Sequence, residues 1–193
     1  RQMCIRDSYK DNKSECFTPG FILVLHTFGR DLKWNPHIHC LVSEGGIGNS
    51  GLWRSKTHFN YTFLRNAFRT ALLDLMEKEI GTSFKSVKNR CYKEHKHGFY
   101  VYAKPNKCNP KIVTKYIGRY LGRPVIATSR IDRYDGETVT FHYNRHEDNR
   151  LITEFVPVME FIQRLIQHIP KKHFKQIRYY GLYAGNHKND SKA

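Results

Sequence analysis

Two histidines separated by one residue, His37 and His39, are the first residues whose types and spacing could do chemistry. On a β-strand, side chains at positions i and i+2 point to the same face, so both imidazoles would project together. Two imidazoles in that arrangement can chelate one divalent metal ion. The alternative interpretation is a solvated strand face with two polar side chains, because so short a motif often occurs by chance.

Two tyrosines, Tyr116 and Tyr120, form the second candidate group. At a spacing of four residues they would lie on one face of a helix, one turn apart. Lys115, Arg119 and Arg123 flank them. Positive charge favours the phenolate form of a tyrosine, and a phenolate is a nucleophile. The alternative is an ordinary amphipathic helix whose tyrosines pack in the core.

The charge of the chain points to an anionic partner. Its 193 residues include 33 Lys and Arg against 17 Asp and Glu, a formal net charge of +16. Residues 84–123 alone hold eleven Lys and Arg against one acidic residue, Glu94. Such clustering is typical of a nucleic-acid binder, although a charged helix face is often merely solvated. The side chains that we expect to contact phosphate are Lys111, Lys115, Arg119 and Arg123.

Aromatic residues stand in the same basic segment. Alternation along a strand would place about half of them in the core, and the others could stack on the bases of a single strand. The residues concerned are Tyr92, Phe99, Tyr100 and Tyr102. A second His-x-His pair, His95 and His97, is interpreted as a solvated basic cluster.

The elements that must position these residues follow from the hydrophobic pattern. Runs of strand character cover residues 21–28, 37–44, 98–103 and 151–155, and the first two suggest an antiparallel pair. Asp135-Gly136 predicts a hairpin with a type I′ turn. Helical periodicity covers residues 58–80, 110–121 and 157–169. This mixture predicts an α+β fold, with a central antiparallel sheet and helices packed on it.

Several classes of protein lack support in the sequence. No stretch approaches the roughly 18 apolar residues that a membrane span needs. Neither a P-loop nor a Gly-x-Ser-x-Gly elbow is present, which disfavours ATP use and serine hydrolase chemistry. The five cysteines form no Cys-x-x-Cys pair, so we expect free thiols and no cysteine zinc site.

Several stretches resemble one known family. WNPHIHCLVSEGG, preceded by LHTFGRDL, is similar to the His-hydrophobic-His motif of two-tyrosine transposases of rolling-circle insertion sequences, the insertion-sequence-ninety-one type. VYAKP followed by KYIGRYLGRPVI resembles their tyrosine helix and its lead-in, and DGETVTFHY and IRYYGLYA also resemble the family. The similarity covers about residues 20–185.

The resemblance implies the palm-like sheet of the His-hydrophobic-His endonucleases and a role in DNA transposition. His37 and His39 would bind Mg²⁺ or Mn²⁺, and Tyr116 and Tyr120 would cleave single-stranded DNA at transposon ends and targets. Each cleavage would leave a 5′-phosphotyrosine and a free 3′-OH, which then attacks another phosphotyrosine and rejoins strands.

Two histidines leave a divalent metal under-coordinated, so we expect a third protein ligand. His26, in the family-like LHTFG stretch of the neighbouring strand, is the candidate, and Asn35 is a weaker one. A polar side chain satisfied by backbone or water is the alternative interpretation of His26.

The expected catalytic domain covers residues 21–185, between an irregular segment, 1–20, and a polar tail, 186–193. Family members generally carry an N-terminal Cys-rich zinc-binding region, which we expect this chain to lack. The resemblance also implies action in the bacterial cytoplasm, at the nucleoid. Two other functions stay open: a non-catalytic nucleic-acid-binding domain, and a rolling-circle replication initiator or relaxase with similar chemistry.

Overall fold

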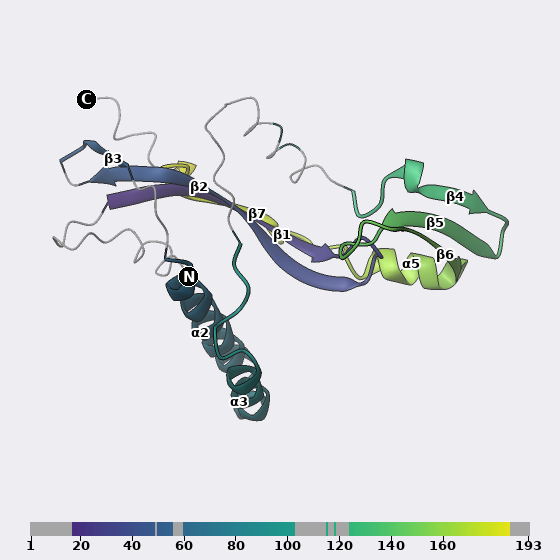
Figure 1. Cartoon of the computed structure of the whole chain (residues 1–193), viewed down its shortest axis with the longest axis horizontal. Coiled ribbons are helices and arrows are strands. Elements are labelled where there is room, and N and C mark those ends of the chain that lie inside the picture. Colours follow the sequence, from purple (N-terminus) through teal and green to yellow (C-terminus); the bar gives the residue numbers. More distant parts are fainter. Residues whose placement is uncertain are drawn as a thin grey trace. The chain divides into compact units, whose positions relative to one another are not determined.

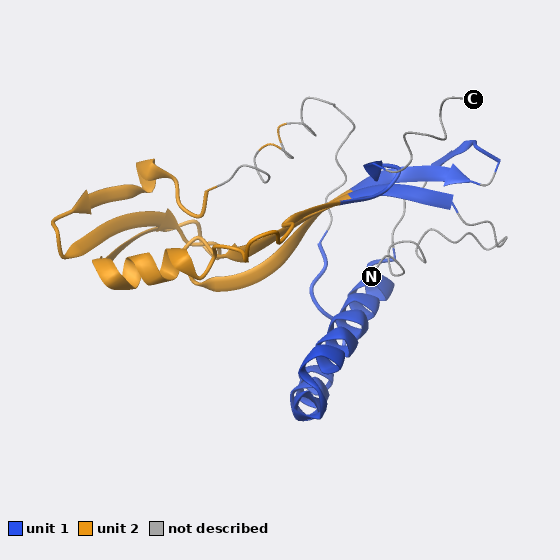
Figure 2. Ribbon diagram, turned by 180° about the vertical axis from the view of Figure 1, so that it is seen from behind, with its two compact units in different colours: residues 1–21, 42–107, 179–193 blue, residues 22–41, 108–178 orange. Residues whose placement is uncertain are grey.

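A computed structural model of the chain describes residues 17–48, 50–55, 60–102, 115, 118 and 124–185 (Figure 1). The fold is α+β, with antiparallel strand pairs and packed helices, as the hydrophobic pattern predicts. The described residues fall into two compact units (Figure 2). Unit 1 lies within residues 1–21, 42–107 and 179–193, and unit 2 within residues 22–41 and 108–178.

A four-stranded sheet has the order β3-β2-β1-β7. Its strands are β1 (Phe17–Phe28), β2 (Trp34–Gly48), β3 (Trp53–Ser55) and β7 (Ile177–Gly181). The first two predicted strands are therefore confirmed as neighbours in one sheet. β1 begins at Phe17, inside the segment expected to be irregular, and β2 continues to Gly48. Gly46 permits this extension because it has no side chain. A Cβ at this position would lie only 2.5 Å from the Thr18 carbonyl oxygen and would clash with it.

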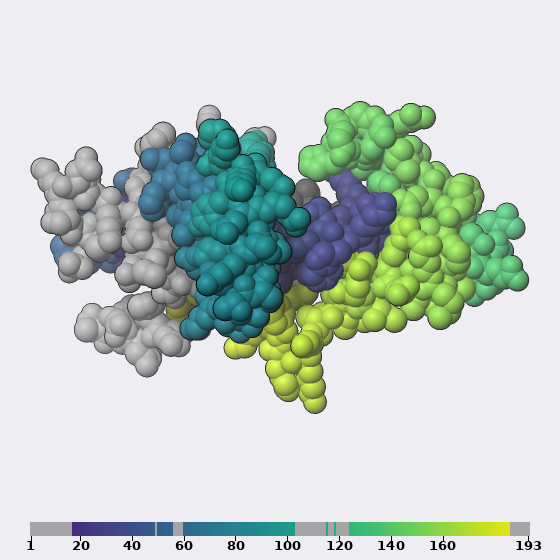
Figure 3. Space-filling view, turned by 90° about the horizontal axis from the view of Figure 1, so that it is seen from below, coloured from purple at the N-terminus to yellow at the C-terminus, as the bar shows by residue number. Residues whose placement is uncertain are grey.

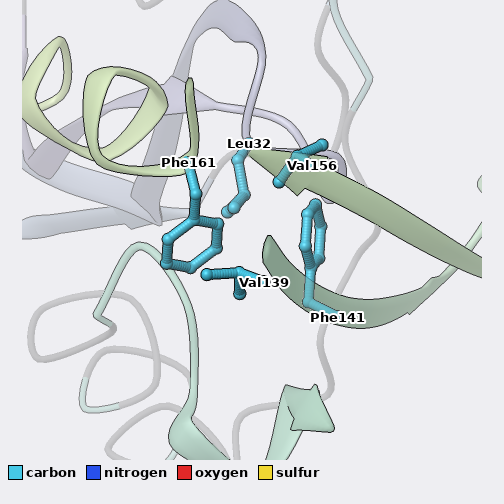
Figure 4. Close-up of a cluster of buried hydrophobic side chains, with 5 residues drawn as sticks. All are labelled: Leu32, Val139, Phe141, Val156 and Phe161. Atoms are coloured by element: carbon cyan, nitrogen blue, oxygen red, sulfur yellow. The ribbon is translucent and has the colours of Figure 1, made fainter. Parts of the chain in front are cut away.

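A three-stranded antiparallel sheet, with the order β4-β5-β6, forms the centre of unit 2. Its strands are β4 (Ile131–Tyr134), β5 (Thr138–Asn144) and β6 (Leu151–Pro157), and a 3₁₀ helix, η2 (Thr128–Arg130), precedes them. Helix α5 (Val158–Ile166) follows directly and packs against β5 and β6. The core side chains come from β5, β6, α5 and the turn between β1 and β2 (Figure 4): Leu32, Val139, Phe141, Val156 and Phe161.

The hairpin between β4 and β5 is confirmed, but the predicted type I′ turn is wrong. A type I′ turn needs a positive φ at both central residues, and of the pair only Gly136 has one, +101°. The Asp135 carboxylate instead accepts hydrogen bonds from the amides of Glu137 (3.1 Å) and Thr138 (2.7 Å). These two hydrogen bonds lower the pKa of the Asp135 carboxyl group, and the bond from the Thr138 amide has the larger effect.

Two helices dominate unit 1. Helix α2 (Tyr61–Ile80) begins at the Asn60 side chain, which accepts a hydrogen bond from the Phe63 amide, and ends at Gly81, as predicted. A 3₁₀ helix, η1 (Thr82–Phe84), leads into α3 (Lys85–Glu94), which the hydrophobic pattern did not predict. Lys88 of α3 binds two carboxylates of α2, Asp74 (2.6 Å) and Glu77 (2.7 Å). These ion pairs join the two helices.

The predicted strand at residues 98–103 is wrong for its described part, residues 98–102, which form no ladder. Their backbone groups bind helix α2 instead. The Phe99 amide donates to the Arg65 carbonyl (3.2 Å), and the Arg65 guanidinium donates to the Val101 carbonyl (3.4 Å). The sequence of this segment alternates as that of a strand does, but the segment lies alongside a helix and pairs with no strand among the described residues.

The helix predicted at residues 110–121 lies almost wholly outside the described residues, and of its positions only Lys115 and Gly118 are described, both helical. Strand β6 and helix α5 confirm the predictions for residues 151–155 and 157–169, with the helix ending at Ile166. None of the described helices has both the length and the apolar character required to span a membrane.

Replacing Phe141 with Ala should lower the free energy of unfolding by about 3–5 kcal/mol, because a large fully buried ring leaves a cavity. The matched control is Phe155→Ala on the adjacent strand, whose ring is 72% exposed and whose removal should change stability by under about 0.5 kcal/mol. Urea unfolding of both variants measures the difference. Equal destabilisation by the two changes would contradict this assignment of the core.

Candidate metal centre

Three histidines from two neighbouring strands meet in unit 2. His26 comes from β1, and His37 and His39 come from β2. One ring nitrogen of each lies within 4.8 Å of one ring nitrogen of the other two. The ring centroids are 4.7 Å apart for His26–His39, 4.9 Å for His37–His39 and 5.6 Å for His26–His37. Within the described residues no carboxylate or thiol joins this group.

The local structure explains why the rings converge. The strand period places His37 and His39 on one face of β2, and the adjacent strand supplies His26 beside them. His26 is buried and stacks on Phe28, with centroids 5.3 Å apart and planes 15° from parallel. His37 and His39 are half-buried, so the cluster has a buried side and a side open to solvent.

A backbone contact fixes the orientation of His37. Its Nδ1 lies 2.8 Å from the carbonyl oxygen of Asn35. A carbonyl oxygen only accepts hydrogen bonds, so Nδ1 carries the proton and Nε2 of the neutral ring presents a lone pair. Metal-binding histidines are commonly oriented in this way by a carbonyl or carboxylate. This contact of Asn35 with the site is made by its main chain rather than its side chain.

Cys40 is next to the cluster in sequence but differs from it chemically. Desolvation by burial raises the pKa of its thiol to about 12. The thiol therefore stays protonated at neutral pH, whereas a metal ligand must be a thiolate. The alternation along β2 also predicts that Cys40 faces away from His37 and His39.

The turn between β1 and β2 holds the two strands that carry the histidines. Leu32, in this turn, is fully buried although its φ is +64°, a costly conformation for a residue with a side chain. His168 Nε2 donates to the Leu32 carbonyl (2.8 Å), and the Thr27 hydroxyl donates to His168 Nδ1 (3.1 Å). The buried His168 ring also stacks in parallel with Trp34, at 5.9 Å between centroids.

Arginine side chains bind the same turn to the three-stranded sheet. Arg164 on α5 donates to the Asp31 carbonyl (3.3 Å) and to the Glu154 carboxylate (2.8 Å). Arg30 donates to the Asn144 carbonyl at the end of β5 (2.9 Å). No sequence motif indicates these roles, because the contacts to the turn join residues more than 100 positions apart.

The donor set fits one transition-metal ion. A metal bound at about 2.1 Å to each imidazole would bring the three nitrogens to within roughly 3–3.5 Å of one another, so the rings need only small side-chain movements. Three neutral nitrogens suit first-row transition ions better than Mg²⁺, which prefers oxygen ligands. Three protein ligands also leave coordination positions for oxygen atoms of water or a substrate.

The structure thus brings together His26, His37 and His39. Lys115 is described as an exposed helical residue, whereas other candidates lie outside the described residues: Tyr116, Tyr120, Lys111, Arg119 and Arg123. His95 and His97 lie exposed in the turn after α3, and no metal-binding group in the described part of the chain includes them. The second His-x-His pair is consistent with a solvated basic cluster.

Comparisons with known proteins identify relatives of the chain. A family model described as "Putative transposase" matches residues 20–191. The chain is 30% identical over 185 residues to the "Transposase for insertion sequence element IS801" of Pseudomonas savastanoi pv. phaseolicola, covering 86% of this chain and 43% of that protein. It is also 30% identical over 192 residues to the "Putative transposase y4qJ" of Sinorhizobium fredii (strain NBRC 101917 / NGR234), covering 90% and 48%.

The chain spans less than half the length of both curated relatives. No solved structure matches it significantly. The family match nevertheless extends over nearly all of the sequence and includes all three histidines of the cluster. The chain therefore belongs to the transposase family of the insertion-sequence-ninety-one type.

Proposed function

We propose that the chain is the core of a metal-dependent transposase that cleaves and rejoins single-stranded DNA through phosphotyrosine intermediates. The observation that supports this most directly is the convergence of His26, His37 and His39. A cluster of three imidazoles with one open side is a suitable place for a divalent ion beside a phosphate. Membership of a transposase family supports DNA as the partner.

In this proposal the three histidines hold Mn²⁺ or Mg²⁺. Of these two ions, Mn²⁺ is the first-row transition ion and accepts imidazole ligands more readily than Mg²⁺ does. When bound, such an ion polarises a scissile phosphate. His37 contributes Nε2, since its Nδ1 is committed to the Asn35 carbonyl. His26, buried against Phe28, provides the ligand with least freedom to move.

Tyr116 and Tyr120 are the proposed nucleophiles. The oxygen of one tyrosine forms a bond to phosphorus while the bond from phosphorus to the 3′ oxygen breaks, and that oxygen takes up a proton. The tyrosine then carries the 5′ end of the strand. Attack by a 3′-OH on the phosphotyrosine reverses these changes and joins strands without ATP. Two tyrosines allow two strands to be held in one cycle.

The basic segment around the tyrosines would hold the strand. Lys111, Lys115, Arg119 and Arg123 are spaced to lie along or beside the tyrosine helix. Cations at these positions would neutralise phosphate charge near the reacting tyrosine and favour its phenolate form. A replication initiator or relaxase would use the same chemistry, whereas a pure binding domain would form no covalent adduct.

The double variant Tyr116→Phe/Tyr120→Phe should form no covalent DNA adduct yet bind single-stranded DNA as the wild type does, because only the nucleophilic oxygens are removed. The assay mixes protein with labelled strands bearing candidate element ends, with Mn²⁺, Mg²⁺ or chelator, and resolves the products on a denaturing gel. Wild-type protein should give a metal-dependent, protease-sensitive band of low mobility. An adduct that persists in the double variant would overturn the tyrosine assignment, and its absence from wild type on ends that an intact relative cleaves would favour a binding domain.

Replacing His26 with Ala should weaken Mn²⁺ binding by at least about tenfold. Mutating even a residue that only hydrogen-bonds to a metal ligand typically lowers metal affinity by about 10–100-fold. His37→Ala and His39→Ala should do the same. The matched control is His95→Ala/His97→Ala, which removes the other His-x-His pair and should leave Mn²⁺ affinity unchanged. Mn²⁺ titration followed by electron paramagnetic resonance measures this directly. Unchanged affinity in His26→Ala would remove His26 from the ligand set.

The affinity for single-stranded DNA should fall steeply as salt rises, because each phosphate contact releases counterions. Replacing Lys111 or Lys115 with Ala should flatten the slope of log K against log salt by about 0.7 for each phosphate that is no longer neutralised. Lys88→Ala serves as the control, because the Lys88 ammonium already binds Asp74 and Glu77. A slope that none of the changes alters would argue against phosphate contacts at Lys111 and Lys115.

A further inference from the structure

Two exposed tyrosines of unit 1 stand parallel on the segment that follows α3. Tyr100 is 78% exposed and Tyr102 is 70% exposed. Their ring centroids are 6.4 Å apart and their planes differ by only 4°. A single exposed aromatic side chain is ordinary, but two that stand parallel and side by side present adjacent flat apolar faces to solvent. Figure 1 shows the segment running back alongside α2, and Figure 3 shows α2 and α3 as a continuous teal surface.

The backbone contacts of the segment hold the two rings outward. The Phe99 ring, which precedes the two tyrosines, packs against two other rings. The distances between ring centroids are 6.2 Å to Phe68 of α2 and 5.3 Å to His95. The Phe99 amide and the Val101 carbonyl both bind Arg65 of α2. Because Phe99 and Val101 are turned to the protein, the alternate residues Tyr100 and Tyr102 face solvent.

A glycine makes this close approach possible. Gly98 has a φ of +83°, and a Cβ at that position would overlap the backbone of Arg65. The segment therefore lies directly against the helix backbone. A backbone already docked on a helix has less conformational freedom to lose when its outward side chains bind a partner.

The parallel rings are oriented as bases are in a stacked strand. Bases stack about 3.4 Å apart along a strand, so two steps cover about 6.8 Å. The centroid spacing of 6.4 Å is slightly shorter than this value, so the rings would have to part slightly to admit a base between them, whereas bases can stack on their outer faces without such a movement. The Arg65 guanidinium lies 5.7 Å from the Tyr100 centroid and adds positive charge beside the rings.

The charge of the sequence around the two tyrosines favours a phosphate-bearing partner. The tyrosines lie in the middle of residues 84–123, which carry eleven Lys and Arg against one acidic residue. Aromatic rings beside a basic segment are the usual composition of a surface that binds single strands. The bases of a duplex are already stacked and paired, so their faces are not accessible to these rings.

We propose that Tyr100 and Tyr102 form a stacking platform that binds the unpaired bases of single-stranded DNA. The platform stands before the proposed tyrosine nucleophiles in the sequence and would hold unpaired bases independently of the metal. The choice of DNA as the occupant rests on the proposed function. The stacking itself rests on the two rings, on the Arg65 guanidinium beside Tyr100 and on the basic sequence in which they stand.

The test compares Tyr100→Ala, Tyr102→Ala and the double variant with wild type in the full chain, using a labelled oligothymidine and fluorescence anisotropy with chelator present. Each single change should weaken binding by about tenfold, within the range measured for loss of base stacking. Tyr100→Phe/Tyr102→Phe, which keeps both rings, should bind as the wild type does. Tyr134→Ala removes a 61% exposed tyrosine from unit 2 and should have no effect.

A second oligomer of equal charge but without bases separates stacking from phosphate binding. Wild type and the double Ala variant should bind this abasic strand equally, and thermal melting should show both proteins equally folded. Equal binding of oligothymidine by both proteins would overturn the platform, as would an equal weakening on the abasic strand. Tighter binding of an RNA oligomer of the same length would overturn the assignment to DNA. If stacking persists with chelator but the protein forms no adduct with Mn²⁺ or Mg²⁺ on ends that an intact relative cleaves, the platform would stand and strand transfer would be contradicted.

Discussion

Insertion of Leu32 into the core of unit 2 is the constraint on which the candidate metal centre depends. The residue closes the turn between the strand of His26 and the strand of His37 and His39. Its left-handed backbone is unfavourable by itself, so burial of the side chain and the hydrogen bond from His168 must stabilise it. With the turn fixed, the two strands have little freedom to slide, and a slip by one residue would turn His37 and His39 to the opposite face.

The histidine cluster could be predicted from the sequence because it depends on local periodicity. The strand period alone places His37 and His39 together, and the expected neighbouring strand brings His26 beside them. The role of Leu32 could not be predicted in that way. A leucine at positive φ contradicts local preference, and only contacts with β5, β6 and α5, far along the chain, explain it. The positions of Tyr116 and Tyr120 stay predictions, because both lie outside the described residues.

The segment at residues 98–102 shows how a correct pattern can lead to a wrong element. Alternation of inward and outward side chains is a property of an extended backbone, whatever its hydrogen-bond partner. Here the partner is the Arg65 backbone and guanidinium of α2, rather than another strand. The alternating pattern therefore identifies the two faces of the segment but not its environment. Helix α3 is not predicted for a related reason: its sequence, KSVKNRCYKE, contains few apolar residues, and the ion pairs that join it to α2 are tertiary contacts.

The hydrogen bond from His37 to the Asn35 carbonyl has a consequence for how this site tolerates mutation. Because the acceptor belongs to the main chain, no substitution of the residue 35 side chain removes it directly. Pro36 between them favours an extended conformation at residue 35, which helps to keep that carbonyl in place. The tautomer of His37, a proposed metal ligand, is thus set by the path of the backbone. Substitutions at residue 35 should therefore have little effect on the orientation of the His37 imidazole. Replacement of Pro36 should loosen the backbone at residue 35 and let the imidazole rotate.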